Sequence, residues 1–232
     1  MTRQLTLNVR LSDHACFENF LPGANEQAVH SVGELIDGGS GLLLLHGAQG
    51  TGKTHLLYSA QKAALAAARR AEYFSMSDEE VLDGLGRFDE AGALVCVDDI
   101  DRVAGDARLE RFLFNLVEIL RPTQSGLLLA GRKPPSECGY GLADLLSRLN
   151  SGASIRLSPL TDNDKAAAMR LRAQHRGFHL PTEVIAYVMK RFPRDTTALF
   201  TLLDRIDRYS LSAQRKVTIP LIRELESTRA VD

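Results

Sequence analysis

The chain has 232 residues, of which 44% are apolar and 25% charged, with 28 Lys and Arg against 29 Asp and Glu. This composition excludes an intrinsically disordered chain and a membrane-embedded one, and the length suits one large domain or two small ones. The total charge is near neutral, although residues 161–232 carry a net +4 against −5 for the rest, so autonomous sequence-specific DNA binding is not expected.

The first predicted element is an extended segment at the N-terminus. Residues 4–11 alternate between polar and apolar types, so residues 1–12 are either an edge strand or an extended docking peptide. The sequence lacks a secretory signal pattern at this end, and its three cysteines are widely spaced without a Cys-x-x-Cys pair. We therefore expect a cytoplasmic protein with neither a disulfide framework nor a zinc site.

Strands and helices alternate along the next 130 residues or so. A helix is expected over residues 24–36, an apolar strand over 42–46 and an Ala-rich helix over 53–70. Four more strands are expected at 72–75, 93–97, 127–130 and 154–157, with helices at 78–85 and 109–120. Apolar strands that alternate with helices predict an α/β fold, in which a parallel sheet is covered by helices on both faces.

After Pro159 the hydrophobic period is helical only. Thr161 and Pro181 mark two helix starts, a third helix runs from about Thr196, and a short one follows Thr218. The sequence thus predicts three parts, an extended peptide at 1–12, an α/β base at 13–160 and a small all-helical lid at 161–232.

The strongest chemical signal lies between the strand at 42–46 and the helix that follows. The motif G-x-x-x-x-G-K-T is formed by Gly47, Ala48, Gln49, Gly50, Thr51, Gly52, Lys53 and Thr54. Glycines let backbone N–H groups turn inward around a phosphate, and the N-terminus of the next helix adds positive dipole. We expect Lys53 to reach the β- and γ-phosphates and Thr54 to bind Mg²⁺, rather than a tight turn that only happens to be rich in glycine.

Two carboxylates end the buried strand at 93–97. Ligands bind at the carboxyl ends of parallel strands, so Asp98 is expected in the Mg²⁺ shell and Asp99 is expected to polarise the attacking water. A solvated strand end that begins a helix is the alternative for both acids.

Arg148 lies in a stretch expected to be helical and exposed. It can serve a neighbouring molecule's nucleotide in trans, as arginine fingers do, or form an ordinary surface ion pair. The sequence leaves both alternatives open.

Together these motifs resemble the AAA+ family of P-loop ATPases, and within it the bacterial replication initiator DnaA and its short regulatory relatives. Residues 17–20 and 23–25 look like the family's adenine-covering box, which implies nucleotide contacts for Phe20 and Asn25. His55, which directly follows the phosphate-binding loop, is also expected among the nucleotide-binding residues. Residues 141–149 are similar to the arginine-finger region of the short relatives, which implies the trans role for Arg148. The helix-turn-helix domain of the initiator has no counterpart in the sequence.

The N-terminal segment also resembles a docking peptide of this family. Gln4, Leu5 and Leu7 match the Q-L-x-L pattern that binds the bacterial sliding clamp, the beta subunit of DNA polymerase III. An extended peptide can offer the Gln4 amide for hydrogen bonds and two leucines for apolar pockets. The resemblance thus implies a clamp-binding site at these three residues.

Two positions depart from the family pattern. Gly131-Arg132 stands where the family usually has an acidic sensor, and the lid's sensor arginine falls on Thr197, with Arg194 nearby as a substitute. We therefore expect ADP or ATP to bind with Mg²⁺, but intrinsic hydrolysis to be weak or absent.

The resemblance implies a nucleotide-bound negative regulator of replication initiation at the replisome. It would dock on the DNA-loaded clamp and stimulate hydrolysis of ATP bound to DnaA, as a monomer or a homo-oligomer. An autonomous AAA+ ATPase that loads or remodels replication partners is the alternative. A small-molecule P-loop kinase is disfavoured by the tandem Asp98-Asp99 and the all-helical C-terminal part.

Overall fold

The structure is a computed structural model that describes residues 15–78 and 91–228. Within these residues the chain forms two compact units. The first unit contains residues 15–17 and the described part of 24–159, and the second contains residues 18–23 and 160–228. Residues 18–23 thus cluster with the second unit, whereas the sequence pattern predicts them within the base.

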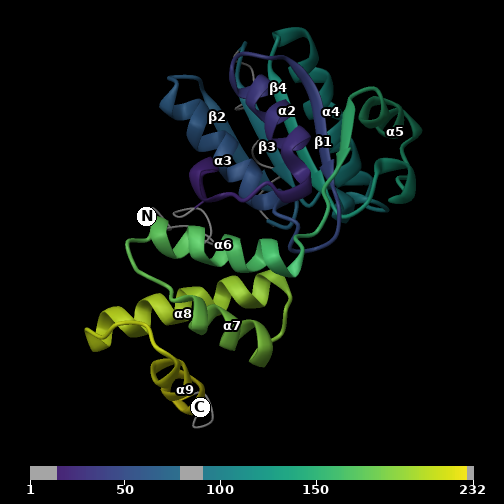
Figure 1. The fold of residues 1–232 in the computed structure, drawn as a ribbon. Coiled ribbons are helices and arrows are strands. Elements are labelled where there is room, and N and C mark those ends of the chain that lie inside the picture. Colours follow the sequence, from purple (N-terminus) through teal and green to yellow (C-terminus); the bar gives the residue numbers. More distant parts are fainter. Residues whose placement is uncertain (1–14, 79–90, 229–232) are drawn as a thin grey trace, which may run out of the picture. The chain divides into compact units, whose positions relative to one another are not determined.

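The first unit is built on a parallel sheet, which confirms the predicted α/β class (Figure 1). Its strands are β1 (Gly41–His46), β2 (Ala71–Ser75), β3 (Leu94–Asp98), β4 (Gly126–Gly131) and β5 (Ala153–Arg156). Among the described residues their spatial order is β2-β3-β4-β1-β5, and every neighbouring pair is parallel. The three central strands, β3, β4 and β1, are largely apolar because both faces of such a sheet are covered.

Helices cover the two faces of this sheet. One face is covered by α2 (Glu26–Ile36) and α3 (Lys53–Ala66), and the other by α4 (Ala107–Leu120) and α5 (Ala143–Asn150) (Figure 1). Val95 and Val97 of β3 belong to the same apolar cluster as the buried residues of α4 and α5. Alternate strand residues point to opposite faces, so Leu94 and Cys96, both fully buried, face the α2–α3 side.

Short 3-10 turns connect several of these elements. They are η1 (Phe17–Asn19), η2 (Gly23–Asn25), η4 (Ile100–Val103), η5 (Arg121–Thr123) and η6 (Pro135–Glu137). The helix expected over 53–70 ends earlier, at Ala66, because Ala68 has a φ of +57° and the chain turns there. The Arg69 guanidinium then donates to five backbone carbonyls, those of Leu35, Ile36, Gly39, Gly92 and Ala93.

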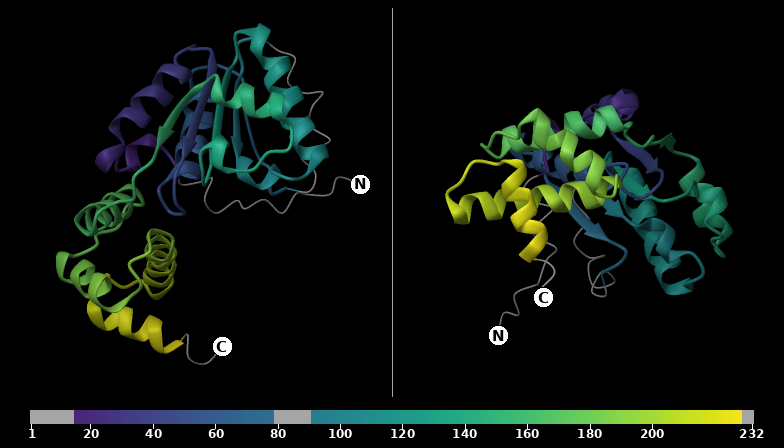
Figure 2. Two further views of the ribbon diagram at one scale, coloured as in Figure 1. Left: turned by 90° about the vertical axis from the view of Figure 1, so that its right-hand side faces the viewer. Right: turned by 60° about the horizontal axis from the view of Figure 1, so that its bottom comes forward.

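The second unit contains helices α6 (Asp162–His175), α7 (Thr182–Arg191), α8 (Thr196–Ala213) and α9 (Ile219–Thr228) (Figure 2). Thr161 and Asp164 form a reciprocal capping box at the start of α6, as the sequence predicts. Fourteen buried apolar side chains from these helices and their connections form a separate core. The helix expected at 78–85 falls mainly on residues outside the described part of the chain.

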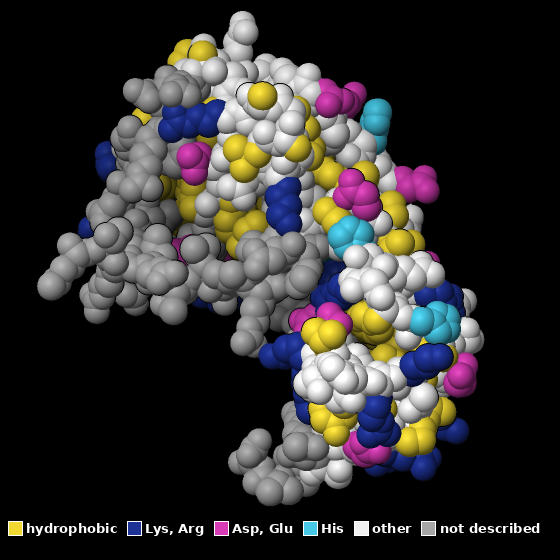
Figure 3. Space-filling model, turned by 90° about the vertical axis from the view of Figure 1, so that its left-hand side faces the viewer, with side chains coloured by type: hydrophobic (Ala, Val, Ile, Leu, Met, Phe, Trp, Pro, Cys, Tyr) yellow, Lys and Arg dark blue, Asp and Glu magenta, His cyan; other side chains and the backbone are white. Residues whose placement is uncertain are grey.

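Many basic residues of the second unit are paired with acceptors of the same unit. Arg176 lies 2.5 Å from Asp204 Oδ1, and Arg215 lies 2.6 Å from Glu224 Oε2. Figure 3 shows basic and acidic side chains interspersed over this unit on the face in view. These ion pairs involve some of the basic side chains of this unit. None of the helices in residues 15–78 and 91–228 has the length and hydrophobicity needed to cross a membrane.

Candidate nucleotide site

The predicted phosphate-binding loop, residues 47–54, joins β1 to α3 at the carboxyl edge of the sheet. Gly47 has a φ of +154°, and a Cβ atom there would lie 2.6 Å from the Leu157 carbonyl oxygen. Gly50 and Gly52 have φ values of +79° and +96°, which L side chains rarely adopt. Glycine is therefore required by backbone geometry at these three positions, which supports the predicted loop.

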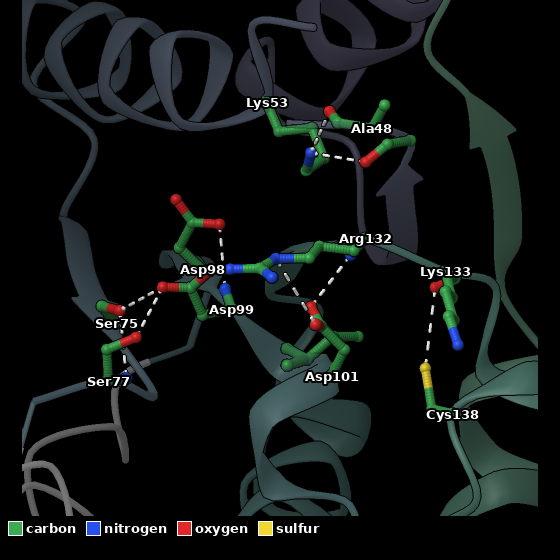
Figure 4. A network of polar contacts seen from close by, with 12 residues as sticks. Ala48, Lys53, Ser75, Ser77, Asp98, Asp99, Asp101, Arg132, Lys133 and Cys138 are labelled. Atoms are coloured by element: carbon green, nitrogen blue, oxygen red, sulfur yellow. Dashed lines mark hydrogen bonds and ion pairs between the residues drawn. The ribbon is translucent and has the colours of Figure 1, made fainter. Parts of the chain in front are cut away.

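Lys53 begins α3 and folds back over this loop. Its Nζ donates to the carbonyl oxygens of Gly47 at 2.7 Å and Ala48 at 2.9 Å (Figure 4). The side chain is only 9% exposed, and burial lowers the pKa of Lys53 although nearby aspartates oppose the shift. A third hydrogen bond, from Thr51 Oγ1 to the Ala48 carbonyl at 2.9 Å, lies within the loop.

The predicted Mg²⁺ ligands lie in contact with each other. Thr54 Oγ1 donates to Asp98 Oδ2 at 2.6 Å, and the Tyr73 hydroxyl donates to the same oxygen at 3.4 Å. Burial raises the pKa of Asp98, partly offset by the Thr54 hydrogen bond. A hydroxyl beside a carboxylate suits a hard divalent cation. No cluster of three His, Cys, Asp or Glu residues that could hold a metal ion occurs in the described part of the chain.

Asp99 follows with an unusual backbone, because its φ of +58° is in the left-handed region. The Ser75 and Ser77 hydroxyls both donate to Asp99 Oδ2, at 3.2 and 2.6 Å (Figure 4). The carboxylate predicted to polarise water is therefore held by two serines from the end of β2. These serines could not be identified from the sequence, because they lie more than 20 residues from Asp99 and match no motif.

Arg132 follows the end of β4 at the same edge of the sheet. Its backbone N–H donates to Asp101 Oδ1 at 2.9 Å, and its Nε lies 3.9 Å from Asp101 Oδ2. In Figure 4 its guanidinium extends toward Asp98 and Asp99. A cation, not an acid, thus stands at this tip, as the sequence departure suggested.

Arg148 forms an ion pair within the first unit. Its Nε lies 2.7 Å from Oε1 of Glu118 on α4, and both side chains are just over one-third exposed. The ion-pair alternative for Arg148 is therefore realised in this structure. Glu118 carried no signal in the sequence, because its partner lies 30 residues along the chain.

Other predicted contacts have defined surroundings. The Asn25 side chain exchanges hydrogen bonds with the Ser158 backbone, donating to O at 3.0 Å and accepting from N at 2.7 Å. His55 Nε2 lies 2.9 Å from the Cys16 carbonyl. These contacts give Asn25 and His55 structural partners, and their contact with a nucleotide stays a prediction.

Phe20 and Arg194 belong to the second unit. Arg194 Nη1 lies 2.6 Å from Asp162 Oδ2, and Thr197 donates its N–H to Asp195 Oδ1 at the start of α8. The predicted clamp-binding residues Gln4, Leu5 and Leu7 lie outside the described residues.

Two families match this chain over separate stretches. The family described as the bacterial DnaA ATPase domain matches residues 11–156, and the one described as the lid domain of Hda matches residues 162–225. The first match covers more than half of the 232 residues.

Solved structures share the fold. Domain III of the Thermotoga maritima replication initiation protein DnaA aligns with a TM-score of 0.77 and 21% identity, over 91% of this chain and 95% of that one. DnaA from Aquifex aeolicus, in a structure bound to AMPPCP, aligns with a TM-score of 0.68 and 22% identity, over 83% and 64%. The Thermotoga maritima RuvB Holliday junction branch migration motor aligns with a TM-score of 0.67 and 14% identity, over 96% and 74%. At these identities the structures show a common fold. The two family matches show more, namely that this chain belongs to the bacterial DnaA ATPase-domain family of AAA+ proteins and is of the Hda type, which supports a role in regulating DnaA in replication.

Proposed function

We propose that this chain binds an adenine nucleotide and stimulates hydrolysis of ATP held by DnaA, through Arg148 acting in trans. The nucleotide site is supported by the loop glycines with positive φ and by Lys53, Thr54 and Asp98 around them. The DnaA relative that binds AMPPCP adds the choice of an adenine nucleotide. Lys53 and the loop amides would hold the phosphates, while Thr54 and Asp98 would hold Mg²⁺, which neutralises phosphate charge when bound.

The direction of α5 is the observation that carries the trans assignment. The start of α5 is held by Glu110 in the first turn of α4, through the N–H groups of Gly141 and Leu142. Near its other end, Arg148 meets Glu118 in the last turn of α4. The two helices therefore run in the same direction, away from the carboxyl edge where the chain's own loop lies. Glu118 is eight residues beyond Glu110, so Arg148 is displaced by about 12 Å along α4 from that edge.

This placement separates two functions on one unit. The loop, Thr54 and Asp98 would serve the chain's own nucleotide, whereas Arg148 lies toward the opposite edge with a side chain that is more than one-third exposed. An exposed arginine away from the protein's own phosphates suits the phosphates of a second protein, because a guanidinium binds phosphate oxygens through a planar fork of donors.

Docking on the DNA-loaded sliding clamp through Gln4, Leu5 and Leu7 belongs to the same proposal, on the basis of the sequence pattern. Docking raises the local concentration of the protein near DNA-bound DnaA, so stimulation would need less protein when the clamp is present. The double variant Gln4→Ala/Leu5→Ala should lose this clamp-dependent gain but keep nucleotide binding. Equal stimulation with and without the clamp would refute the docking part of the proposal.

An autonomous ATPase is the second candidate, favoured by the complete set of Lys53, Thr54, Asp98 and Asp99 at one edge. The two candidates differ in whose ATP is hydrolysed. Steady-state turnover by the purified chain, abolished by Lys53→Ala, would support the autonomous enzyme. The regulator instead predicts negligible turnover alone and Arg148-dependent hydrolysis on DnaA.

A further inference from the structure

A tyrosine of β2 lies in contact with Asp98, the carboxylate predicted to bind Mg²⁺. The Tyr73 hydroxyl donates to Asp98 Oδ2 at 3.4 Å, and Thr54 Oγ1 donates to the same oxygen at 2.6 Å. The other oxygen, Oδ1, accepts the backbone N–H of Asp99 at 2.9 Å. Both oxygens of the carboxylate therefore have hydrogen-bond donors, and these come from α3, from β2 and from the residue that follows β3.

The register of the sheet brings Tyr73 to this position. In the parallel pair of β2 and β3, Tyr73 lies opposite Cys96 and Ser75 lies opposite Asp98. Alternate residues of a strand point to the same face of a sheet, so Tyr73 and Asp98 share a face and are one diagonal step apart. A long aromatic side chain can bridge such a step. The contact thus joins residues that are 25 positions apart in the sequence.

The ring of Tyr73 is supported by a second tyrosine, from α3. Tyr58 stacks on it with the ring centroids 4.0 Å apart, and Tyr58 itself is only 8% exposed. Thr54 precedes Tyr58 by four residues, so the two side chains lie on the same face of the helix. One face of α3 therefore carries both the hydroxyl that contacts Asp98 directly and the ring that packs against Tyr73.

Tyr73 has the chemistry of an outer partner to a metal ligand. A phenol is protonated near neutral pH, so its hydroxyl donates to the carboxylate. Asp98 is only 4% exposed, so protein donors rather than solvent orient its carboxylate. Partners of this kind orient metal ligands, and their loss typically costs about 10- to 100-fold in metal affinity.

We propose that Tyr73 is a positioning residue for Asp98, holding its carboxylate in the orientation that binds the Mg²⁺ of the chain's own nucleotide. This inference rests on the proposed nucleotide site. In this role Tyr73 acts only through Asp98 and is not itself a ligand of the cation. The same strand supplies Ser75 to Asp99, so β2 holds both acids that follow one another at the end of β3 (Figure 4).

The test measures binding of AMPPCP to the full chain by calorimetry, once in EDTA and once in saturating Mg²⁺. The ratio of the two dissociation constants is the gain in affinity from Mg²⁺. Because free AMPPCP binds Mg²⁺ equally in every experiment, a loss of Mg²⁺ affinity within the complex lowers this gain by the same factor. Tyr73→Phe should lower the gain about tenfold, at the weaker end of the range for such partners because the hydrogen bond is long. Its affinity for AMPPCP in EDTA should stay within about twofold of the wild type, since the phosphate-binding loop is unchanged.

Two further variants separate positioning from a general effect of the substitution. Tyr187→Phe is the matched control, because the Tyr187 hydroxyl donates to Glu226 Oε2 at 3.3 Å in the second unit, and it should leave the gain unchanged. Asp98→Ala removes the carboxylate through which Tyr73 acts. Adding Tyr73→Phe to Asp98→Ala should therefore change the gain by less than about twofold, since the effects of coupled residues do not add.

The outcomes separate this inference from the proposed function. If Mg²⁺ raises the affinity of the wild type and Thr54→Ala loses that gain, but Tyr73→Phe keeps it, the positioning role is refuted and the nucleotide site stands. Equal losses of affinity for Tyr73→Phe in EDTA and in Mg²⁺, or a further loss of the gain in the Asp98→Ala background, would also refute the positioning role. If the wild type does not bind AMPPCP, or binds it equally with and without Mg²⁺, the proposed site fails and the positioning role fails with it.

Discussion

Replacing Glu110 should weaken the first unit through loss of a buried anion. Its carboxylate is 2% exposed, and Oε1 accepts from the N–H groups of Gly105 at 2.8 Å and Gly141 at 2.9 Å. Oε2 accepts from Leu142 N–H at 2.7 Å. In Glu110→Gln, the amide oxygen can keep two of these bonds while the NH₂ group faces the third donor. The variant thus leaves one buried donor unsatisfied and two hydrogen bonds without a charged acceptor. We therefore expect the free energy of unfolding to fall by about 3 kcal/mol.

Urea denaturation followed by circular dichroism measures this loss, with Glu137→Gln as a control at an exposed acid in the same unit. Hydrogen exchange adds a local readout, because the amides of Gly141 and Leu142 should exchange faster in Glu110→Gln. The reasoning is refuted if Glu110→Gln unfolds within about 0.5 kcal/mol of the wild type and both amides exchange unchanged, since surface substitutions stay within that range.

The same carboxylate predicts a pH dependence. Burial favours the neutral acid, but the three N–H donors outweigh it and hold the pKa of Glu110 below its usual value of 4.5. A carboxyl whose pKa is lower in the folded state stabilises the fold fully above the unfolded pKa and loses that contribution as pH falls through the folded pKa. The stability difference between wild type and Glu110→Gln should therefore be largest near neutral pH and shrink as the pH falls below 4.5. A constant difference across that range would contradict this assignment.

Three further predictions concern the loop, the fold and Asp99. Thr54→Ala should leave the nucleotide affinity measured by calorimetry in EDTA unchanged. The gain in affinity on adding Mg²⁺ should be at least about tenfold smaller than in the wild type, because a hydroxyl ligand is lost. A gain equal to that of the wild type would contradict the Mg²⁺ assignment. Arg69→Met should cost about 2–4 kcal/mol in urea denaturation, since five carbonyls lose a shared charged donor; a loss under about 0.5 kcal/mol would refute this. The double variant Ser75→Ala/Ser77→Ala should release Asp99 and raise the rate of the chain's own single-turnover ATP hydrolysis about tenfold, which is less than the full contribution of a positioned general base. An unchanged rate would mean that the two serines do not restrain Asp99.

The sequence predicts those features that depend on local pattern. A continuous apolar run such as β3 indicates a strand buried on both faces, and the glycine motif between a strand and a helix fixes the loop and Lys53. Strand starts and ends were accurate to about one residue because turn residues flank them. The end of α3 was four residues off, since the turn at Ala68 carries no glycine or proline.

Features made by contacts between distant residues were not predictable. Glu110 and Glu118 look like ordinary helix-surface acids in the sequence, yet one is buried under three backbone donors and the other holds Arg148. Only the folded chain brings α5 against α4 and so defines these partners. The amide of Asn25 shows the same limit, because its partner Ser158 lies 133 residues away.

The account depends most on Arg148 acting on ATP that another protein holds. The direct measurement is a single-turnover experiment in which only DnaA carries labelled ATP, on clamp-loaded DNA, with wild type, Arg148→Ala or Arg191→Ala added. Arg191 is the matched control, an exposed arginine paired through Nε with a glutamate in the second unit. We expect wild type and Arg191→Ala to accelerate hydrolysis equally. Removal of an arginine finger costs about a thousandfold or more in rate, so Arg148→Ala should lose an acceleration of that order. Equal acceleration by Arg148→Ala and the wild type would contradict it.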